Sequence, residues 1–419
     1  SEALAFYYLT RKPGEKLLVI APNNAFVAWE DELPICVPTF DKSIKRLMGG
    51  AKRIATLLAD DPDVSIISYQ QLPGVIGSVC AYLRRNTVCM MVDESHRMKK
   101  GNEGVHGASI LNLSFLPCRK LILSGTPMPN SSTDLVSQLQ FLFPEVRTQA
   151  ESVIDDFQPF FVRTTKAELQ LPPVKRVRID VEMSESQRRL YESLASNAAR
   201  HLSGLSARER LSFRRVGKQV QYMLEAASNP GLLVNSDIGD HELLSAALAD
   251  GMSNKMKESC KIARTLVKEG NKVLIWSGFV KTVEHLADLL ADVGSEFIHG
   301  GIGTDDDDDN LESREAIIRR FNDPESSCHV LVANPAACSE GISLHHVCHH
   351  ALYIDRNYNA AQYLQSEDRI HRIGLAEDVM TYVYILTSPN TIDESVARRL
   401  EFKVERMGDA LNDPNLNIE

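Results

Sequence analysis

The 419-residue sequence lacks the features of several common protein classes. No apolar stretch reaches the roughly 18 residues that a membrane-spanning helix needs, so we expect no membrane partner. The N-terminus shows no signal-peptide pattern, and no 20–50-residue repeat is apparent. The eight cysteines include no C-x-x-C pair. This usage indicates reduced thiols in an intracellular protein, with a bacterial cytoplasm and a eukaryotic nucleus equally open.

An excess of positive charge is also missing. Lysine and arginine total 46 against 56 aspartate and glutamate, which gives a net charge of −10. Any contact with DNA must therefore come from a locally basic groove. The longest acidic run, Asp305–Asp309, lacks the alternating ligand pattern of a calcium loop, so we interpret it as a solvated loop. Basic residues gather mid-chain, at Lys166, Lys175, Arg176, Arg178, Arg188 and Arg189.

Strand and helix patterns alternate in both halves of the chain. In the first half we expect strands at 17–21, 64–69, 87–92 and 120–124, with helices at 44–59 and 134–141. Residues 184–248 read as helical. Strand patterns resume at 272–276, 296–298, 329–332, 351–354 and 379–385. This alternation predicts an α/β fold with two parallel sheets, each covered on both faces by helices. The expected domains are 1–165, a linker and helical region at 166–255, and 256–419.

The strongest chemical signal is Asp93-Glu94-Ser95-His96, directly after an apolar strand pattern. Open α/β sheets place their ligand chemistry at the carboxyl ends of strands. One carboxylate can hold a magnesium ion through its water shell, and the next can orient a water for attack on a γ-phosphate. Taken alone, the four residues are equally well read as a capped strand-to-helix turn.

Three further segments gain meaning from their order. Ser124-Gly125-Thr126-Pro127 ends a strand, and Ser339-Glu340-Gly341-Ile342-Ser343 follows another after a short connection. Both are also compatible with ordinary loops. The third segment, 365–374, has a helical pattern that would place Arg369 and Arg372 on one face. Two guanidinium groups aimed together suit a polyanionic ligand, although Arg–Glu pairs on a solvated helix fit as well.

In this order, the segments resemble motifs II, III, V and VI of superfamily-two helicase-like ATPases, and more narrowly of the Swi/Snf-type DNA translocases. Further segments are similar to that branch: 17–23 with Trp29 and Glu32 to motif Ia, 159–166 with 171–173 to the exit from the first lobe, and 272–277 to motif IV. The resemblance covers about residues 4–405. It departs from the family at Cys338-Ser339, Tyr358, Ala360 and Leu375.

The resemblance implies two tandem RecA-like lobes with a helical insertion between them, ATP in the cleft, and ATP-driven translocation along double-stranded DNA. Asp93 would bind magnesium through water, Glu94 would activate the attacking water, and Arg369 and Arg372 would neutralise the transferring phosphoryl group. The implied nucleotide and coupling residues are His96, Ser124, Gly125, Thr126, Gly341, Gln365 and Asp368. The implied DNA contacts are Pro22, Asn23, Ser277, Ser343 and Asn359.

One expected element is absent from the sequence: the G-x-G-K-[ST] loop whose amides and lysine cradle the phosphates of ATP. In the family it lies just before a helix like 2–9, so we expect the chain to start downstream of it and these residues alone not to hydrolyse ATP. Upstream domains and partner proteins stay open, as do two other functions, a strand-separating DNA or RNA helicase and a non-hydrolysing DNA-binding scaffold.

The tract His345, His346, Cys348, His349 and His350 resembles a metal-ligand cluster. No second Cys/His pair has the standard spacing of a zinc site, so we favour a structural role.

Overall fold

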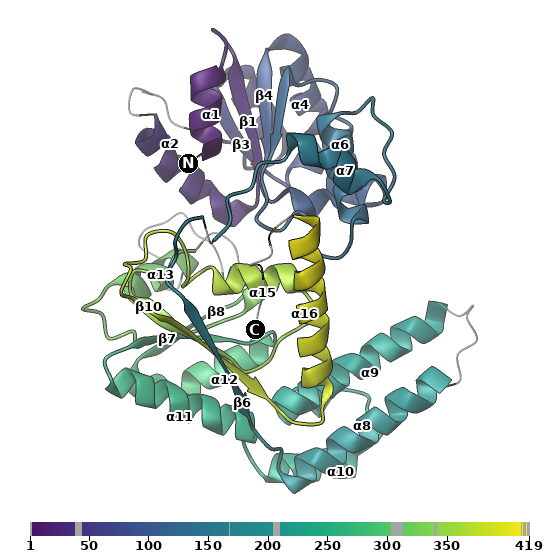
Figure 1. Ribbon diagram of the computed structural model, residues 1–419, viewed down its shortest axis with the longest axis vertical. Helices are drawn as coiled ribbons and strands as arrows, with labels where there is room; N and C mark the ends of the chain where they lie inside the picture. Colours follow the sequence, from purple (N-terminus) through teal and green to yellow (C-terminus); the bar gives the residue numbers. More distant parts are fainter. Residues whose placement is uncertain are drawn as a thin grey trace. The chain divides into compact units, whose positions relative to one another are not determined.

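The computed structural model describes residues 2–37, 44–166, 168–203, 210–302, 313–338, 342–411, 413 and 416, without the side chains of 201–216. The acidic run Asp305–Asp309 and the motif residue Gly341 lie outside the described residues. The chain forms two compact units. The first comprises residues 1–163 and 407–413, and the second comprises 164–406 and 414–419. Figure 1 shows the elements of each unit.

The first unit is built on a parallel sheet with strand order β2-β3-β1-β4-β5. Strand β1 is buried along its whole length, because its alternating side chains enter two separate cores. One core contains α1 and α2, and the other contains α3, α4, α5 and α6. The elements are α1 (Glu2–Thr10), β1 (Lys16–Ala21), α2 (Phe26–Cys36), β2 (Lys45–Arg46), α3 (Ala51–Ala59), β3 (Val64–Ser68), α4 (Leu72–Arg85), β4 (Val88–Val92), α5 (Val105–Leu111), β5 (Arg119–Ile122), α6 (Thr133–Leu142) and α7 (Val153–Phe157).

The second unit has a parallel sheet of order β6-β11-β10-β7-β9-β8. Helices α11 and α12 pack on one face of this sheet, while α15 packs on the other through Tyr353 and Tyr363. The elements are β6 (Val174–Asp180), α8 (Glu185–Ser203), α9 (Arg210–Ser228), α10 (His241–Ala249), α11 (Asn254–Lys268), β7 (Lys272–Trp276), α12 (Val280–Leu289), β8 (Ser295–Ile298), α13 (Arg314–Asn322), β9 (Val330–Ala333), α14 (Pro335–Cys338), β10 (Cys348–Tyr353), α15 (Ala360–Glu367), β11 (Thr381–Thr387) and α16 (Ile392–Ala410).

The prediction of an α/β protein with two parallel sheets is confirmed, and each sheet belongs to one RecA-like unit. The helical pattern at 184–248 corresponds to α8, α9 and α10. The sequence reading missed β6, which joins the second sheet before these helices begin. The helical segment therefore follows the first strand of the second unit.

Two predicted helices are wrong in their extent. Residues 44–59 do not form one helix, because Gly49 and Gly50 adopt φ values of 93° and 88°, and α3 begins only at Ala51. Such left-handed backbone interrupts a helix and favours glycine. The helix expected over 365–374 ends at Glu367, so Arg369 and Arg372 lie in the turns that follow α15.

Candidate nucleotide and DNA site

The first unit presents Asp93 and Glu94 at the carboxyl end of β4, as predicted for a ligand edge. Glu94 adopts φ 49° and ψ 50°, a left-handed backbone that is unusual for glutamate. Such conformations cost of order 1–3 kcal/mol and persist only when their surroundings fix them. The buried Tyr69 hydroxyl supplies part of that support, because it donates to the carbonyl oxygens of Asp93 at 2.6 Å and Glu94 at 3.1 Å.

Donors on two elements orient the Asp93 carboxylate. The indole Nε1 of Trp29, on α2, donates to its Oδ2 at 2.9 Å, and the backbone N–H of Glu94 donates to its Oδ1 at 2.9 Å. Asp93 is only half-buried. A fixed, accessible carboxylate fits magnesium, a hard cation that prefers oxygen ligands and keeps several waters. Asp93 would hold that ion through water, and the ion would supply charge neutralisation for bound phosphates.

A polar chain joins Glu94 to the segment that follows β5. The Glu94 carboxylate lies 3.2 Å from Nδ1 of His96, and the same nitrogen lies 3.3 Å from the Ser124 hydroxyl oxygen. The backbone N–H of Thr126 donates to that hydroxyl oxygen at 3.1 Å. Thr126 is buried and Gly125 exposed. The structure thus joins Glu94, a predicted catalytic residue, to His96, Ser124 and Thr126, three residues of the predicted nucleotide and coupling group.

The second unit holds its two candidate arginines against residues 342 and 343. Arg369 donates from Nη1 to the carbonyl oxygen of Ile342 at 2.7 Å and from Nε to that of Gln365 at 2.9 Å. Arg372 donates from Nη1 to the Ser343 hydroxyl oxygen at 3.2 Å. The positions of the two arginines are therefore set by contacts with residues 342 and 343. They are not set by the spacing of residues along a helix, because α15 ends at Glu367.

Ser343 also lies 3.0 Å from Nδ1 of His345. Burial, helped by the charges of His346 and Arg372, lowers the pKa of His345 to about 4, so the ring is neutral at pH 7. The Ser343 hydroxyl oxygen thus accepts a hydrogen bond from Arg372 and is also within hydrogen-bond distance of the His345 ring. Sequence reasoning assigned Ser343 to DNA and missed this connection to Arg372.

Gln365 and Asp368 lie on either side of the end of α15. Gln365 is buried, and its backbone carbonyl oxygen accepts a hydrogen bond from Nε of Arg369. Asp368 is half-exposed and forms an ion pair with Lys166 at 2.5 Å. Gln365 thus contacts one of the candidate arginines, and Asp368 contacts the segment that precedes β6. The sequence predicted neither contact.

The candidate DNA residues differ in accessibility. Asn23 and Asn359 are exposed, Ser343 is half-exposed and Pro22 is buried. Ser277 is fully buried, and its hydroxyl donates to Oδ2 of Asp355 at 2.7 Å. Its side chain therefore supports the loop after β7 from within.

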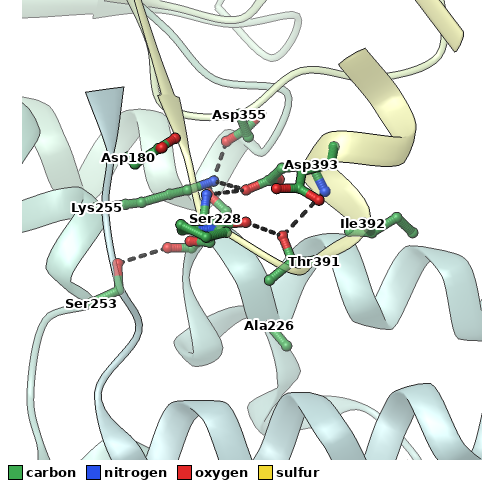
Figure 2. Close-up of polar contacts among 12 residues, drawn as sticks. Asp180, Ala226, Ser228, Ser253, Lys255, Asp355, Thr391, Ile392 and Asp393 are labelled. Carbon is green, nitrogen blue, oxygen red and sulfur yellow. Dashed lines mark hydrogen bonds and ion pairs between the residues drawn. The ribbon is translucent and has the colours of Figure 1, made fainter. Parts of the chain in front are cut away.

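Asp355 is the centre of a buried polar network at the end of the second sheet (Figure 2). Its carboxylate accepts hydrogen bonds from Ser277, from Ser228 at 2.9 Å and from the Gly278 backbone at 2.7 Å. Burial raises the pKa of Asp355 despite these donors. Figure 2 also shows Lys255 paired with Asp393, at 2.5 Å. This network joins the chain segment after β10 to α9, α11 and α16.

The histidine-rich tract and the helices show no sign of a metal site or a membrane span within the described part of the chain. In the described ranges, no three or more His, Cys, Asp or Glu side chains are grouped so that they could hold a metal ion. Instead, the His350 ring of the metal-like tract stacks on Tyr382, with ring centres 5.1 Å apart and planes 3° apart. Among the described helices, none has the length and apolarity to cross a membrane.

Comparison with known proteins finds two family models in sequence order. Residues 4–158 match the SNF2-related domain, and residues 254–374 match the helicase conserved C-terminal domain.

The chain is also similar to curated proteins along most of its length. It is 25% identical over 92% of its length to human "SWI/SNF-related matrix-associated actin-dependent regulator of chromatin subfamily A member 1", of which it covers 38%. It is 26% identical over 95% of its length to the "ISWI chromatin-remodeling complex ATPase ISW1" of Saccharomyces cerevisiae, and covers 36% of that protein. It is 24% identical over 93% of its length to the "ATP-dependent DNA helicase DDM1" of Arabidopsis thaliana, and covers 54% of it. The chain thus spans about a third to a half of the length of these relatives.

Proposed function

Because the chain belongs to the Swi/Snf-type family of helicase-like ATPases, we propose that it is the motor part of an enzyme that hydrolyses ATP to move along double-stranded DNA. The observation that carries this proposal is the position of the motif residues. Asp93 and Glu94 follow a strand of the first unit, while Arg369 and Arg372 lie beside residues 342 and 343 of the second. Since one relative is named a regulator of chromatin and another a chromatin-remodeling complex ATPase, we propose nuclear DNA in chromatin as the first substrate to test.

In this proposal each acidic residue has one task. Glu94 orients the attacking water and takes its proton, and its left-handed backbone fixes the carboxylate beside His96. Asp93 provides the oxygen ligand for magnesium. The Glu94–His96–Ser124 chain then offers a physical route by which a change at the nucleotide reaches the loop after β5.

The arginines supply positive charge to the transferring phosphoryl group, a role worth about 10³–10⁵ in rate in related chemistry. They belong to the second unit and the acidic pair to the first. We therefore propose that hydrolysis requires the two units to approach each other around ATP, which ties the reaction to a domain movement. If DNA is held by both units during that movement, the protein advances along the backbone.

DNA contacts in this proposal are to phosphates, which are independent of sequence. The exposed Asn23, Asn359 and half-exposed Ser343 are the candidate contact side chains, while Pro22 and Ser277 would act through the loops that they shape. The net charge of −10 opposes binding to a polyanion, so contacts to phosphates must be local, and affinity should fall as salt rises because such contacts release counterions.

A second candidate is a DNA-binding scaffold without hydrolysis. A strand-separating helicase is the third candidate, because one relative is described as a DNA helicase.

A chimera separates these functions. The segment of an ISWI relative that precedes its matched region, with its phosphate loop, would be joined ahead of residue 1. A duplex-tracking motor then gives ATPase activity that duplex DNA stimulates, and displaces a triplex-forming strand without separating the duplex. Unwinding of a forked duplex would favour a helicase. Duplex binding with no ATPase would favour the scaffold.

The arginine assignment is tested in the same chimera with Arg372→Ala. We expect turnover to fall by about 10³-fold or more, while the thermal melt and nucleotide-free DNA binding stay close to those of the parent. Arg369→Ala should act similarly and also loosen residues 342–344, because it loses the bond to Ile342. Retention of most of the rate by Arg372→Ala would remove it from the mechanism.

A further inference from the structure

We infer that residues 164–176, here called the connecting strap, position the arginine turn, residues 367–372. The strap is the first stretch of the second unit after the chain leaves the first unit at Arg163. It leads into the edge strand β6. The inference rests on the proposed function for its consequence in hydrolysis, but its structural part is independent of that function.

The arginine turn makes contacts with two different segments of the chain. Arg369 and Arg372 contact Ile342 and Ser343. Three other residues of the turn contact the strap: Glu367 binds Arg176, Asp368 binds Lys166, and His371, which lies between the arginines, binds the carbonyl oxygen of Pro172. The two guanidinium groups therefore belong to a turn whose other polar residues bind the strap.

The strongest of these contacts is the pair between Arg176 and Glu367. It is bidentate, with Nε to Oε2 at 3.0 Å and Nη2 to Oε1 at 2.6 Å. The Glu367 side chain is 1% exposed and that of Arg176 is 15% exposed. Burial alone would lower the pKa of Arg176, but the hydrogen bonds and charge of Glu367 outweigh it and raise that pKa. Removing one partner would leave an uncompensated buried charge, so the pair binds the two segments firmly together.

His371 adds a contact to the strap backbone. Its Nε2 lies 2.7 Å from the carbonyl oxygen of Pro172, so Nε2 carries the proton and donates. His371 is buried, and burial lowers its pKa, which keeps the ring neutral. The third contact, between Lys166 and Asp368, is half-exposed. Such a pair contributes little to stability, but it extends the contact along the strap.

The consequence is a mechanical link between the start of the second unit and the candidate arginine fingers. A displacement of the strap must move Glu367, Asp368 or His371, and both arginines belong to the same short turn as these residues. A partner protein that binds the strap and displaces it would therefore change the rate of hydrolysis without contacting ATP. Arg176, Lys166 and Glu367 are in this sense positioning residues.

Hydrogen exchange of the full 419-residue chain tests the link without any nucleotide. The backbone N–H of Leu344 donates to the carbonyl oxygen of Arg369 at 3.0 Å, so its exchange rate reports on the arginine turn from the opposite side. In Arg176→Met we expect exchange at Leu344 and across residues 367–372 to accelerate about tenfold or more. The double variant Arg176→Met/Glu367→Met removes both charges and should recover part of the protection.

Arg320→Met is the matched control, because Arg320 forms a similar bidentate pair with Glu296, between α13 and β8. It should leave exchange at Leu344 unchanged. If Arg176→Met unfolds the chain, Lys166→Met replaces it, since that pair is half-exposed; a smaller acceleration at 367–372 is then expected. Unchanged exchange at Leu344 in a folded strap variant, or equal acceleration in the control, would overturn the inference.

The chimera gives the functional part of the test. There, Arg176→Met should lower kcat while leaving the KM for ATP and the affinity for duplex DNA unchanged, and Arg320→Met should change none of these. A rise in KM alone would contradict a role in positioning the arginines. If the chimera has no ATPase activity at all, the proposed motor function fails, while the exchange measurement still decides whether the strap holds the turn.

Discussion

At the residue scale, Glu94 combines the expected chemistry with an unexpected backbone. The sequence predicted a carboxylate at a strand end, and the structure adds a left-handed conformation supported by Tyr69. No local pattern indicated that support, because Tyr69 belongs to the segment after β3 and meets Glu94 only in the folded sheet. The same holds for Trp29, which the sequence placed in a motif but not in contact with Asp93.

Glu94→Gln should abolish turnover in the chimera while nucleotide binding persists. Glutamine keeps the size of the side chain but cannot accept the proton of the attacking water, so the barrier should rise by about 3 kcal/mol or more. Single-turnover hydrolysis and equilibrium nucleotide binding, measured together, check both parts. Hydrolysis near the parent rate would exclude Glu94 as the base.

His350 makes folding stability depend on pH. Burial, with the charge of His349, lowers its pKa to about 4 from an ordinary value near 6.5. Between these values the unfolded chain binds a proton that the folded chain does not, so stability is lost as pH falls from 6.5 to 4, by at most about 1.4 kcal/mol per pH unit.

His350→Phe retains a ring that can stack on Tyr382 but removes the titration. Urea unfolding at pH 7.0, 6.0 and 5.0 should therefore show a smaller loss of stability in this variant than in the parent. Identical pH slopes would contradict the assignment.

At the scale of elements, buried strands were predicted well and helix ends poorly. The apolar runs of β1, β4 and β7 are visible in sequence because these strands are buried on both faces. Strand β6 was missed because it is an edge strand with four charged residues among seven and no fully buried residue, so it lacks the apolar run of an interior strand. Its pairing with β11 also depends on distant residues. The end of α15 was missed because polar and charged residues continue the helical pattern beyond Glu367.

The Lys255–Asp393 pair joins the start of α11 to the start of α16. Lys255 is 2% exposed, so Lys255→Met should leave Asp393 charged and unpaired and lower the free energy of unfolding by about 3–5 kcal/mol. Lys261→Met, in the same helix, removes a pair whose lysine is 73% exposed and should change it by less than about 1 kcal/mol. Chemical denaturation of both variants checks the difference. Equal changes in the free energy of unfolding would show that the buried pair stabilises the fold no more than the exposed pair does.

At the scale of the whole molecule, the sequence indicated two α/β units because the strand–helix pattern stops and resumes. It did not indicate that residues 407–413 belong to the first unit, since that assignment depends on packing. The site was predictable to the extent that motif residues follow buried strands. The Ser343–Arg372 and strap contacts were not, because they join segments far apart in sequence.

The polypeptide of residues 1–419 should bind ATP weakly and hydrolyse none, because no loop in it offers the amides and lysine that cradle the phosphates. Isothermal titration with magnesium–ATP, beside a phosphate-release assay with duplex DNA, measures both properties. The chimera is the positive control. Robust magnesium-dependent hydrolysis by residues 1–419 would show that the phosphate site is built from other residues.

The order of synthesis separates the first unit from its last piece, residues 407–413, which begins in the final turn of α16. Residues 407–413 belong to the first unit, where Asp413 pairs with Arg163 at 2.8 Å and Ala410 packs near Leu135 and Phe157. A ribosome therefore delivers this piece only after residues 164–406, the main segment of the second unit, have been translated. The first unit can collapse early, as N-terminal domains generally do. Until residues 407–413 are made, part of the apolar surface of the first unit remains exposed to solvent. A stop codon before residue 407 would leave that surface exposed in the final protein.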